Sequence, residues 1–134
     1  MIIHVEGGTS NGKKLIKFKR GAFMALRSIW PKVHKFHSYF QSPCTGVIDG
    51  LPHYLIGASC PFSTITKIDL PVFRPNEFFW QNHQREGEEK WQTYERVLRQ
   101  IMSEVGDLPL SDLSIEDKFE YKKILYPIKA KKMN

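Results

Sequence analysis

The residues best suited to chemistry lie near the N-terminus, in the glycine-rich segment 6–12 and in the two cations Lys19 and Arg20 that follow it. Glycine and asparagine tolerate positive φ, so this segment predicts a turn-rich loop. A glycine-rich loop at the end of a strand exposes backbone N–H groups, and together with nearby cations it suits a phosphate. Glu6 taken by itself is more often a solvated or capping carboxylate than a ligand-binding group.

A catalytic base is harder to find. A histidine followed five positions later by a carboxylate occurs only at His83 and Glu88, and that acid falls where a helix start favours a glutamate. Residues 8–12 read Gly-x-Ser-x-Gly, but this run is assigned to the glycine-rich loop and not to a serine nucleophile. Cys44 and Cys60 could form one disulfide, but two buried thiols are the preferred interpretation. The sequence therefore predicts no catalytic residue.

A metal centre is not predicted either. His34-x-x-His37 with Cys44 is the nearest approach to a ligand set, and it lacks the paired short spacings of known metal sites.

Three helices are expected, and two of them have strong patterns. Apolar residues spaced by three and four predict an amphipathic helix from about Glu88 to Val105, capped by Gly106. Its predicted core face is made by Trp91, Tyr94, Leu98, Ile101 and Val105. A second helix is expected from Ser114 to Leu125, with Ser114 and Asp117 as a capping box. Weaker spacing predicts a helix over residues 17–29 that ends before Pro31.

Strands are expected over residues 1–5, 32–40 and 64–73, from their apolar, β-branched or alternating composition. Proline and glycine interrupt residues 41–62, where a short helix or turn is expected around residues 54–58. The basic tail from Lys129 to Asn134 is expected to be mobile.

Charge is concentrated in the first part of the chain. The 134 residues carry a net charge of +6, and no acid occurs between Gly7 and Ile48. Residues 1–74 hold ten basic and three acidic residues, for a net charge of +7. Such a segment attracts phosphate or anionic headgroups, and without a nucleic-acid-binding motif a lipid or phosphate partner is favoured over nucleic acid. A solvated basic face is the alternative interpretation.

The segment His-Val-Glu-Gly-Gly-Thr-Ser-Asn-Gly at residues 4–12, followed by Leu-Ile-Lys-Phe-Lys-Arg-Gly-Ala-Phe at residues 15–23, resembles the third sequence block of the glycerolipid acyltransferase family, in particular its lysophospholipid acyltransferase branch. Residues 68–73 resemble the family's fourth block. The helix around Trp91 and the segment 112–121 resemble the regions that follow it. The resemblance thus covers most of the chain in the family's order.

The resemblance implies an α/β fold: a partial acyltransferase-like mixed sheet flanked by helices over residues 1–106, with a helical extension and basic tail over residues 107–134. It also implies that Glu6, Gly7, Lys19 and Arg20 bind the phosphate of the acceptor, and that Pro71 takes the fourth-block position. Family members transfer an acyl group from acyl-CoA to a glycerophosphate or lysophospholipid hydroxyl, with a His-x-x-x-x-Asp base upstream of this block.

The chain departs from the family pattern, since His, Val and Gly at positions 4, 5 and 8 stand where Phe, Pro and Thr are usual. These changes suggest relaxed demands on the loop. The preferred hypothesis is a non-catalytic, acyltransferase-derived subunit with no bound cofactor, a pseudoenzyme docked against other protein chains and anionic lipid. Its expected location is peripheral on an organellar membrane, the mitochondrial inner membrane or the endoplasmic reticulum. The alternative is part of an active acyl-CoA-dependent enzyme whose His-x-x-x-x-Asp half lies on another chain or outside this sequence.

Overall fold

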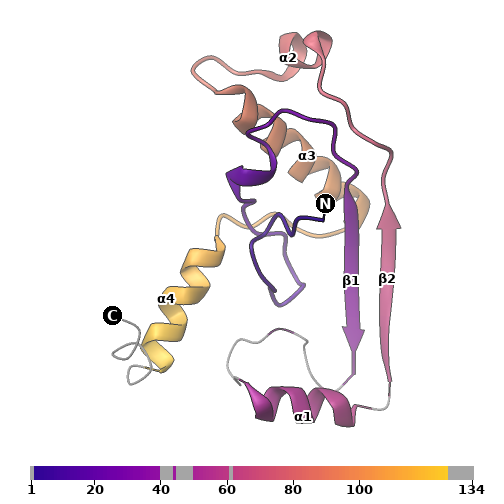
Figure 1. Ribbon diagram of the computed structural model, residues 1–134, viewed down its shortest axis with the longest axis vertical. Helices are drawn as coiled ribbons and strands as arrows, with labels where there is room; N and C mark the ends of the chain where they lie inside the picture. Colours follow the sequence, from indigo (N-terminus) through magenta and orange to yellow (C-terminus); the bar gives the residue numbers. More distant parts are fainter. Residues whose placement is uncertain (1, 40–43, 45–49, 61, 127–134) are drawn as a thin grey trace.

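A two-stranded antiparallel ribbon and a long helix organise the protein, seen here in a computed structural model that describes residues 2–39, 44, 50–60 and 62–126 (Figure 1). Strand β1 (Lys32–Ser38) pairs with β2 (Ser63–Asp69), with Val33 opposite Ile68 and Phe36 opposite Ile65. The strands predicted over residues 32–40 and 64–73 are confirmed, although each ends earlier than expected. The predicted mixed sheet is wrong, because the named strands of the described residues form only this antiparallel pair.

Helix α3 (Lys90–Gly106) confirms the strongest sequence prediction, except that Gly106 is its last helical residue and Asp107, with a φ of 47°, takes the C-cap position predicted for Gly106. The Glu89 side chain accepts the backbone N–H of Gln92, and the Gln92 side-chain oxygen accepts the Glu89 N–H at 2.8 Å, which completes a capping box. Tyr94 and Leu98 are buried as expected, but Val105 is 47% exposed and Met102 is buried instead. The helix therefore turns a slightly different face to the core than the simple spacing predicts.

The core is an aromatic cluster between α3 and the irregular first third of the chain. Tyr94 makes edge-to-face contacts with Phe23, at 5.4 Å between ring centroids, and with Trp80, at 6.3 Å. The short helix α2 (Glu77–His83), which no sequence pattern indicates, contributes Phe79 and Trp80. Asn76 caps α2 by accepting the Phe79 N–H at 2.8 Å. The ribbon reaches this core through Val33, which is 4% exposed.

Two predicted elements are wrong. In place of a helix over residues 17–29 the structure has one 3₁₀ turn, η1 (Arg20–Ala22), and Leu26 adopts a φ of 48°. In place of a strand over residues 1–5, the described residues 2–5 are irregular, and Ile2 is 90% exposed. The backbone of this segment bonds to its own turn and to Lys19, so no strand partner aligns it.

The remaining helices match their predictions. Helix α1 (Leu51–Ser59) forms around the expected residues, and α4 (Ile115–Leu125) begins after Ser114, whose capping box with Asp117 is present. The predicted mobile tail lies outside the described residues. None of the helices among the described residues has the length and apolar composition that a bilayer crossing requires.

Candidate functional site

The glycine-rich loop folds back so that Gly7 meets the stem of Lys19. Gly7 has a φ of 77°, and its N–H donates to the His4 carbonyl at 2.9 Å. The Lys19 N–H donates to the Val5 carbonyl at 2.7 Å, which brings the Lys19 side chain alongside the turn. A Cβ at Gly7 would lie 3.1 Å from two carbons of that side chain, so glycine is required both for the left-handed turn and for the close approach.

Glu6 points into the loop. Its carboxylate accepts the Ile16 N–H at 3.1 Å, so this bond joins the start of the glycine-rich loop to the residues that follow the loop. Burial raises the pKa of the Glu6 carboxyl, and the bonds from the Ile16 N–H and the Ser10 side chain oppose that rise. Glu6 therefore stabilises the loop through these bonds and is not presented to solvent as a free carboxylate.

The N-terminal turn of α4 covers the loop. Ile115 packs against Gly8, where a Cβ would lie 2.9 Å from the Ile115 Cδ1 atom. Glu116 forms an ion pair with Lys19, and the Lys118 ammonium donates to the Thr9 carbonyl at 2.6 Å. An incoming phosphate must therefore compete with a carboxylate for Lys19. Sequence reasoning missed this arrangement, because nothing in the α4 pattern signals contact with a loop a hundred residues earlier.

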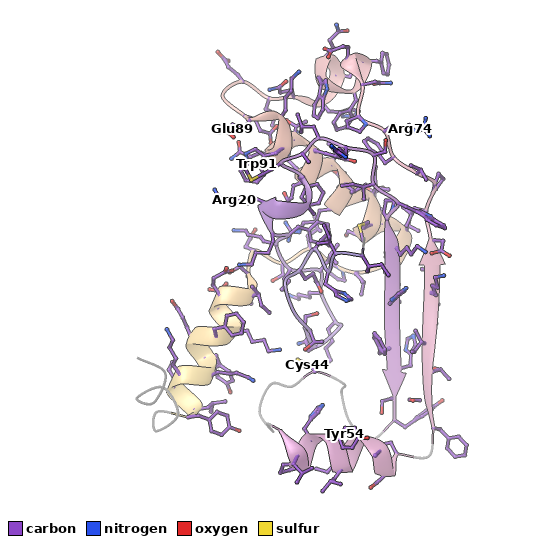
Figure 2. The ribbon with its side chains drawn as sticks, viewed as in Figure 1. Arg20, Cys44, Tyr54, Arg74, Glu89 and Trp91 are labelled. Carbon is purple, nitrogen blue, oxygen red and sulfur yellow. The ribbon has the colours of Figure 1, made fainter. Side chains whose placement is uncertain are left out.

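The other two predicted site residues lie apart from the turn. Arg20 begins η1, and its side chain extends away from the loop (Figure 2). Pro71 is exposed beyond the end of β2, between Leu70, which bonds to Pro31, and Phe73, which bonds to Ile29. The structure thus gathers Glu6, Gly7 and Lys19, and it leaves Pro71 on the ribbon side of the fold.

Arg99 of α3 ties the loop's continuation to the segment before α4. Its guanidinium donates to the carbonyls of Leu15 at 3.0 Å, Ile16 at 3.1 Å and Ser111. The same two segments pair through their backbones, with the Lys17 N–H bonded to the Leu113 carbonyl at 2.9 Å. No sequence signal marks this role, because the partners of Arg99 are backbone carbonyls.

An open cavity of about 600 Å³ lies between α3 and the two segments 17–18 and 85–88. Its floor includes Phe18 and Trp91, and its charged lining mixes Lys17 and Arg85 with Glu95. The Glu95 carboxylate accepts the Phe18 N–H at 3.3 Å, and burial raises the pKa of that carboxyl. The cavity is therefore a mixed-charge hollow adjoining the segment that follows the glycine loop.

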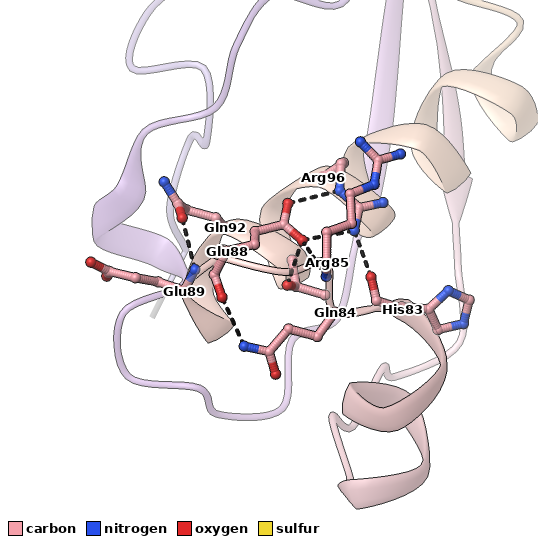
Figure 3. Close-up of polar contacts among 8 residues, drawn as sticks. His83, Gln84, Arg85, Glu88, Glu89, Gln92 and Arg96 are labelled. Atoms are coloured by element: carbon pink, nitrogen blue, oxygen red, sulfur yellow. Dashed lines mark hydrogen bonds and ion pairs between the residues drawn. The ribbon is translucent and has the colours of Figure 1, made fainter.

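The one histidine–carboxylate pair of suitable spacing is not arranged as a base. Glu88 accepts two bonds from Arg96 and one from the Thr93 hydroxyl at 2.8 Å. His83 joins this network only through its carbonyl, and its ring turns away toward Phe79, 5.2 Å between ring centroids (Figure 3). The interpretation of Glu88 as a structural carboxylate is supported.

The Glu88–Arg96 pair predicts a pH dependence of stability. Bonds from Arg96, with help from Thr93, lower the pKa of Glu88 from 4.5 to about 2. Because the folded pKa is depressed, the stabilisation is fully present above about pH 4.5 and is lost as the pH falls toward 2. We expect Glu88→Gln to lose about 1–2 kcal/mol of unfolding free energy at pH 7. Urea denaturation should show that difference shrinking toward pH 2, and a constant difference would contradict the assignment.

The histidines and cysteines of the dismissed metal set lie apart. His34 and His37 are three residues apart on β1, so their side chains leave opposite faces of the ribbon. Cys44 lies beside the loop, its Sγ 3.5 Å from the Thr9 carbonyl. Cys44 and Cys60 are not joined in a disulfide, as preferred, but each is half-buried rather than buried.

A comparison with known proteins places the chain in a wider class. The chain is distantly homologous to part of a lysophospholipid acyltransferase, which confirms the resemblance read from its sequence blocks. It is 30% identical over 121 residues to the lysophospholipid acyltransferase LPEAT1 of Arabidopsis thaliana. The match covers 90% of this chain and 28% of that protein, so the chain spans less than a third of its relative's length. No family model matches the chain. No solved structure matches the chain either, so structural comparison does not confirm the acyltransferase fold.

Proposed function

We propose that this chain provides the acceptor-binding part of an acyltransferase-like protein, holding the phosphate of a glycerophosphate or lysophospholipid headgroup without supplying a catalytic base. The close packing of Gly7 on the stem of Lys19 carries the proposal, because it places a cation beside a glycine turn in a chain that matches part of a lysophospholipid acyltransferase. The histidine–carboxylate geometry adds support for a non-catalytic role. Among the described residues, His83 and Glu88 do not form a dyad.

Binding of glycerol 3-phosphate, measured by calorimetry, tests the headgroup proposal. We expect Lys19→Ala to weaken binding. We expect Glu116→Gln to strengthen it by a factor of about 1.4 to 5, because an exposed ion pair of about 0.2–1 kcal/mol no longer competes for the Lys19 ammonium. Lys67→Ala on β2 removes the same charge elsewhere and should leave binding unchanged. Equal losses from Lys19→Ala and Lys67→Ala would contradict a local phosphate site.

The non-catalytic part of the proposal has a separate test. Incubation of the chain with acyl-CoA and a lysophospholipid should release no free CoA, because no base takes the proton of the acceptor hydroxyl. Release of CoA by the chain alone would overturn this part.

A second candidate function is the acceptor half of an active acyltransferase. The length of the relative favours it, since 72% of that protein has no counterpart in this chain. Its base would then come from a polypeptide carrying His-x-x-x-x-Asp. Acyl transfer that appears only when such a polypeptide is added would distinguish it from a non-catalytic subunit.

A further inference from the structure

The chain contains a long stretch with almost no charge. Between Lys35 and Lys67 the only Asp, Glu, Lys or Arg is Asp49. Helix α1 lies within this stretch and has no charged residue and no buried one. A helix that is apolar on all sides is normally found in a core or in contact with lipid. Here Leu51 is 67% exposed and Tyr54 70% exposed, so α1 has the composition of a covered helix and the accessibility of an uncovered one.

The position of α1 separates it from the core. It joins the far ends of β1 and β2, at the opposite end of the molecule from α2, and Tyr54 lies on it beyond the ribbon (Figures 1 and 2). Tyr39 follows β1 and is 85% exposed, and Phe62 precedes β2 and is 70% exposed. We call α1 together with Tyr39 and Phe62 the ribbon tip. Its exposed aromatic and aliphatic side chains form one end of the protein.

Positive charge lies along the ribbon that carries the tip. The two strands together carry three lysines and one acid, Asp69. Lys32 and Lys67 both pair with that single carboxylate, at 3.6 Å and 3.0 Å. Lys32 and Asp69 face each other at the end of the ribbon away from the tip, so Lys35 and Lys67, in the middle of the ribbon, are the strand cations nearest the tip.

We propose that the ribbon tip docks into the interfacial layer of a membrane containing anionic lipid, with the ribbon lysines against the headgroups. Aromatic side chains favour the boundary between headgroups and acyl chains, and basic side chains favour the anionic surface. Helix α1 has nine residues, and a helix needs about 20 to cross a bilayer, so α1 lies in the interface rather than across it. The charge order, uncharged tip and basic ribbon, fits a lipid surface better than a mixed-charge protein surface.

This inference goes beyond the proposed headgroup site. The ribbon tip shares no residue with the glycine loop, and the loop concerns one headgroup whereas the tip concerns the membrane surface. Failure of one leaves the other standing. Glycerol 3-phosphate, a soluble probe, tests the loop, and vesicles test the tip.

Vesicle flotation with the full chain tests the tip. We expect wild-type protein to float with vesicles of phosphatidylcholine and phosphatidylglycerol, and Leu55→Asp to lower the partition constant about tenfold or more. Leu55 is 54% exposed, so this change is not expected to unfold the protein. The matched control is Phe78→Asp on α2, since Phe78 is 73% exposed at the other end of the molecule. That variant should float like the wild type.

Two further measurements define the contact. Lys35→Glu should weaken binding to the mixed vesicles about fivefold or more, with little effect on vesicles of phosphatidylcholine alone. Hydrogen exchange should show vesicle-dependent protection of α1 amides and no change in α3. The proposal is overturned if wild-type protein does not float, or if Leu55→Asp and Phe78→Asp lose binding equally. Flotation without protection of α1 also overturns it, and a protein partner would then be the better occupant.

Discussion

Replacing Tyr94 with alanine should lower the free energy of unfolding by about 3–5 kcal/mol, the usual cost of deleting a buried aromatic ring. Tyr94 is fully buried and lies at the centre of the cluster formed by Phe23, Phe73 and Trp80. The ring joins α3 to the irregular N-terminal third and to α2, so its loss removes contacts from several segments. Denaturation in urea at neutral pH measures the change.

Tyr94→Phe separates the ring from its hydroxyl. The Tyr94 hydroxyl donates to the Arg27 carbonyl at 3.0 Å, and burial raises the pKa of Tyr94 to about 12, so the group stays protonated at neutral pH. Removing this one bond should cost about 1 kcal/mol. If the alanine and phenylalanine variants lost the same stability, the aromatic cluster would not be the centre of the core.

Local patterns predicted the elements whose stabilising interactions are local. Helix α3 has an apolar stripe and its own capping box, and α4 has Ser114 and Asp117 at its start, so each can be recognised from neighbouring residues. The β1 and β2 predictions succeeded for a similar reason, since each is short, alternating and β-rich. The pattern did not show which apolar residues of β1 face the core. Val33 is buried, whereas Phe36 lies on the opposite face of the ribbon and is exposed.

The predicted helix over residues 17–29 failed because its backbone bonds elsewhere. Lys19 is extended, with a ψ of 134°, and the N–H and carbonyl of Ile29 both bond to Phe73 instead of within a helix. Leu26 then takes a positive φ that no helix allows. Phe18 and Phe23 are nevertheless buried. The apolar spacing therefore predicted correctly which residues are buried, but it did not predict the backbone conformation.

In the candidate site, too, features with a local cause were predicted and features that depend on tertiary contacts were not. The glycine loop could be predicted, because glycine at a turn has a local cause. The ion pair of Lys19 with Glu116 and the inward turn of Glu6 could not, because both depend on tertiary contacts. Resemblance carried residue identities over to the loop, but it carried no information on which partner each side chain has in this chain.

Replacing Arg99 with methionine should lower the free energy of unfolding by about 2–4 kcal/mol, because several hydrogen bonds from one charged donor are lost together. The carbonyls of Leu15, Ile16 and Ser111 would lose their guanidinium partner. The link between the glycine-loop segment and the segment before α4 would then depend on its backbone bonds alone. Hydrogen exchange should show faster exchange at the Lys17 and Ser111 amides.

Two control variants test whether the planar guanidinium group of Arg99 is required. Arg99→Lys keeps the charge and the stem but cannot reach several carbonyls with one planar group, so it should recover only part of the loss. Arg85→Met changes another arginine lining the same cavity and should alter stability by less than about 0.5 kcal/mol. If Arg99→Lys were as stable as the wild type, charge alone would account for the effect. A single ammonium at position 99 would then suffice for the bridge from α3, and the planar guanidinium would not be required.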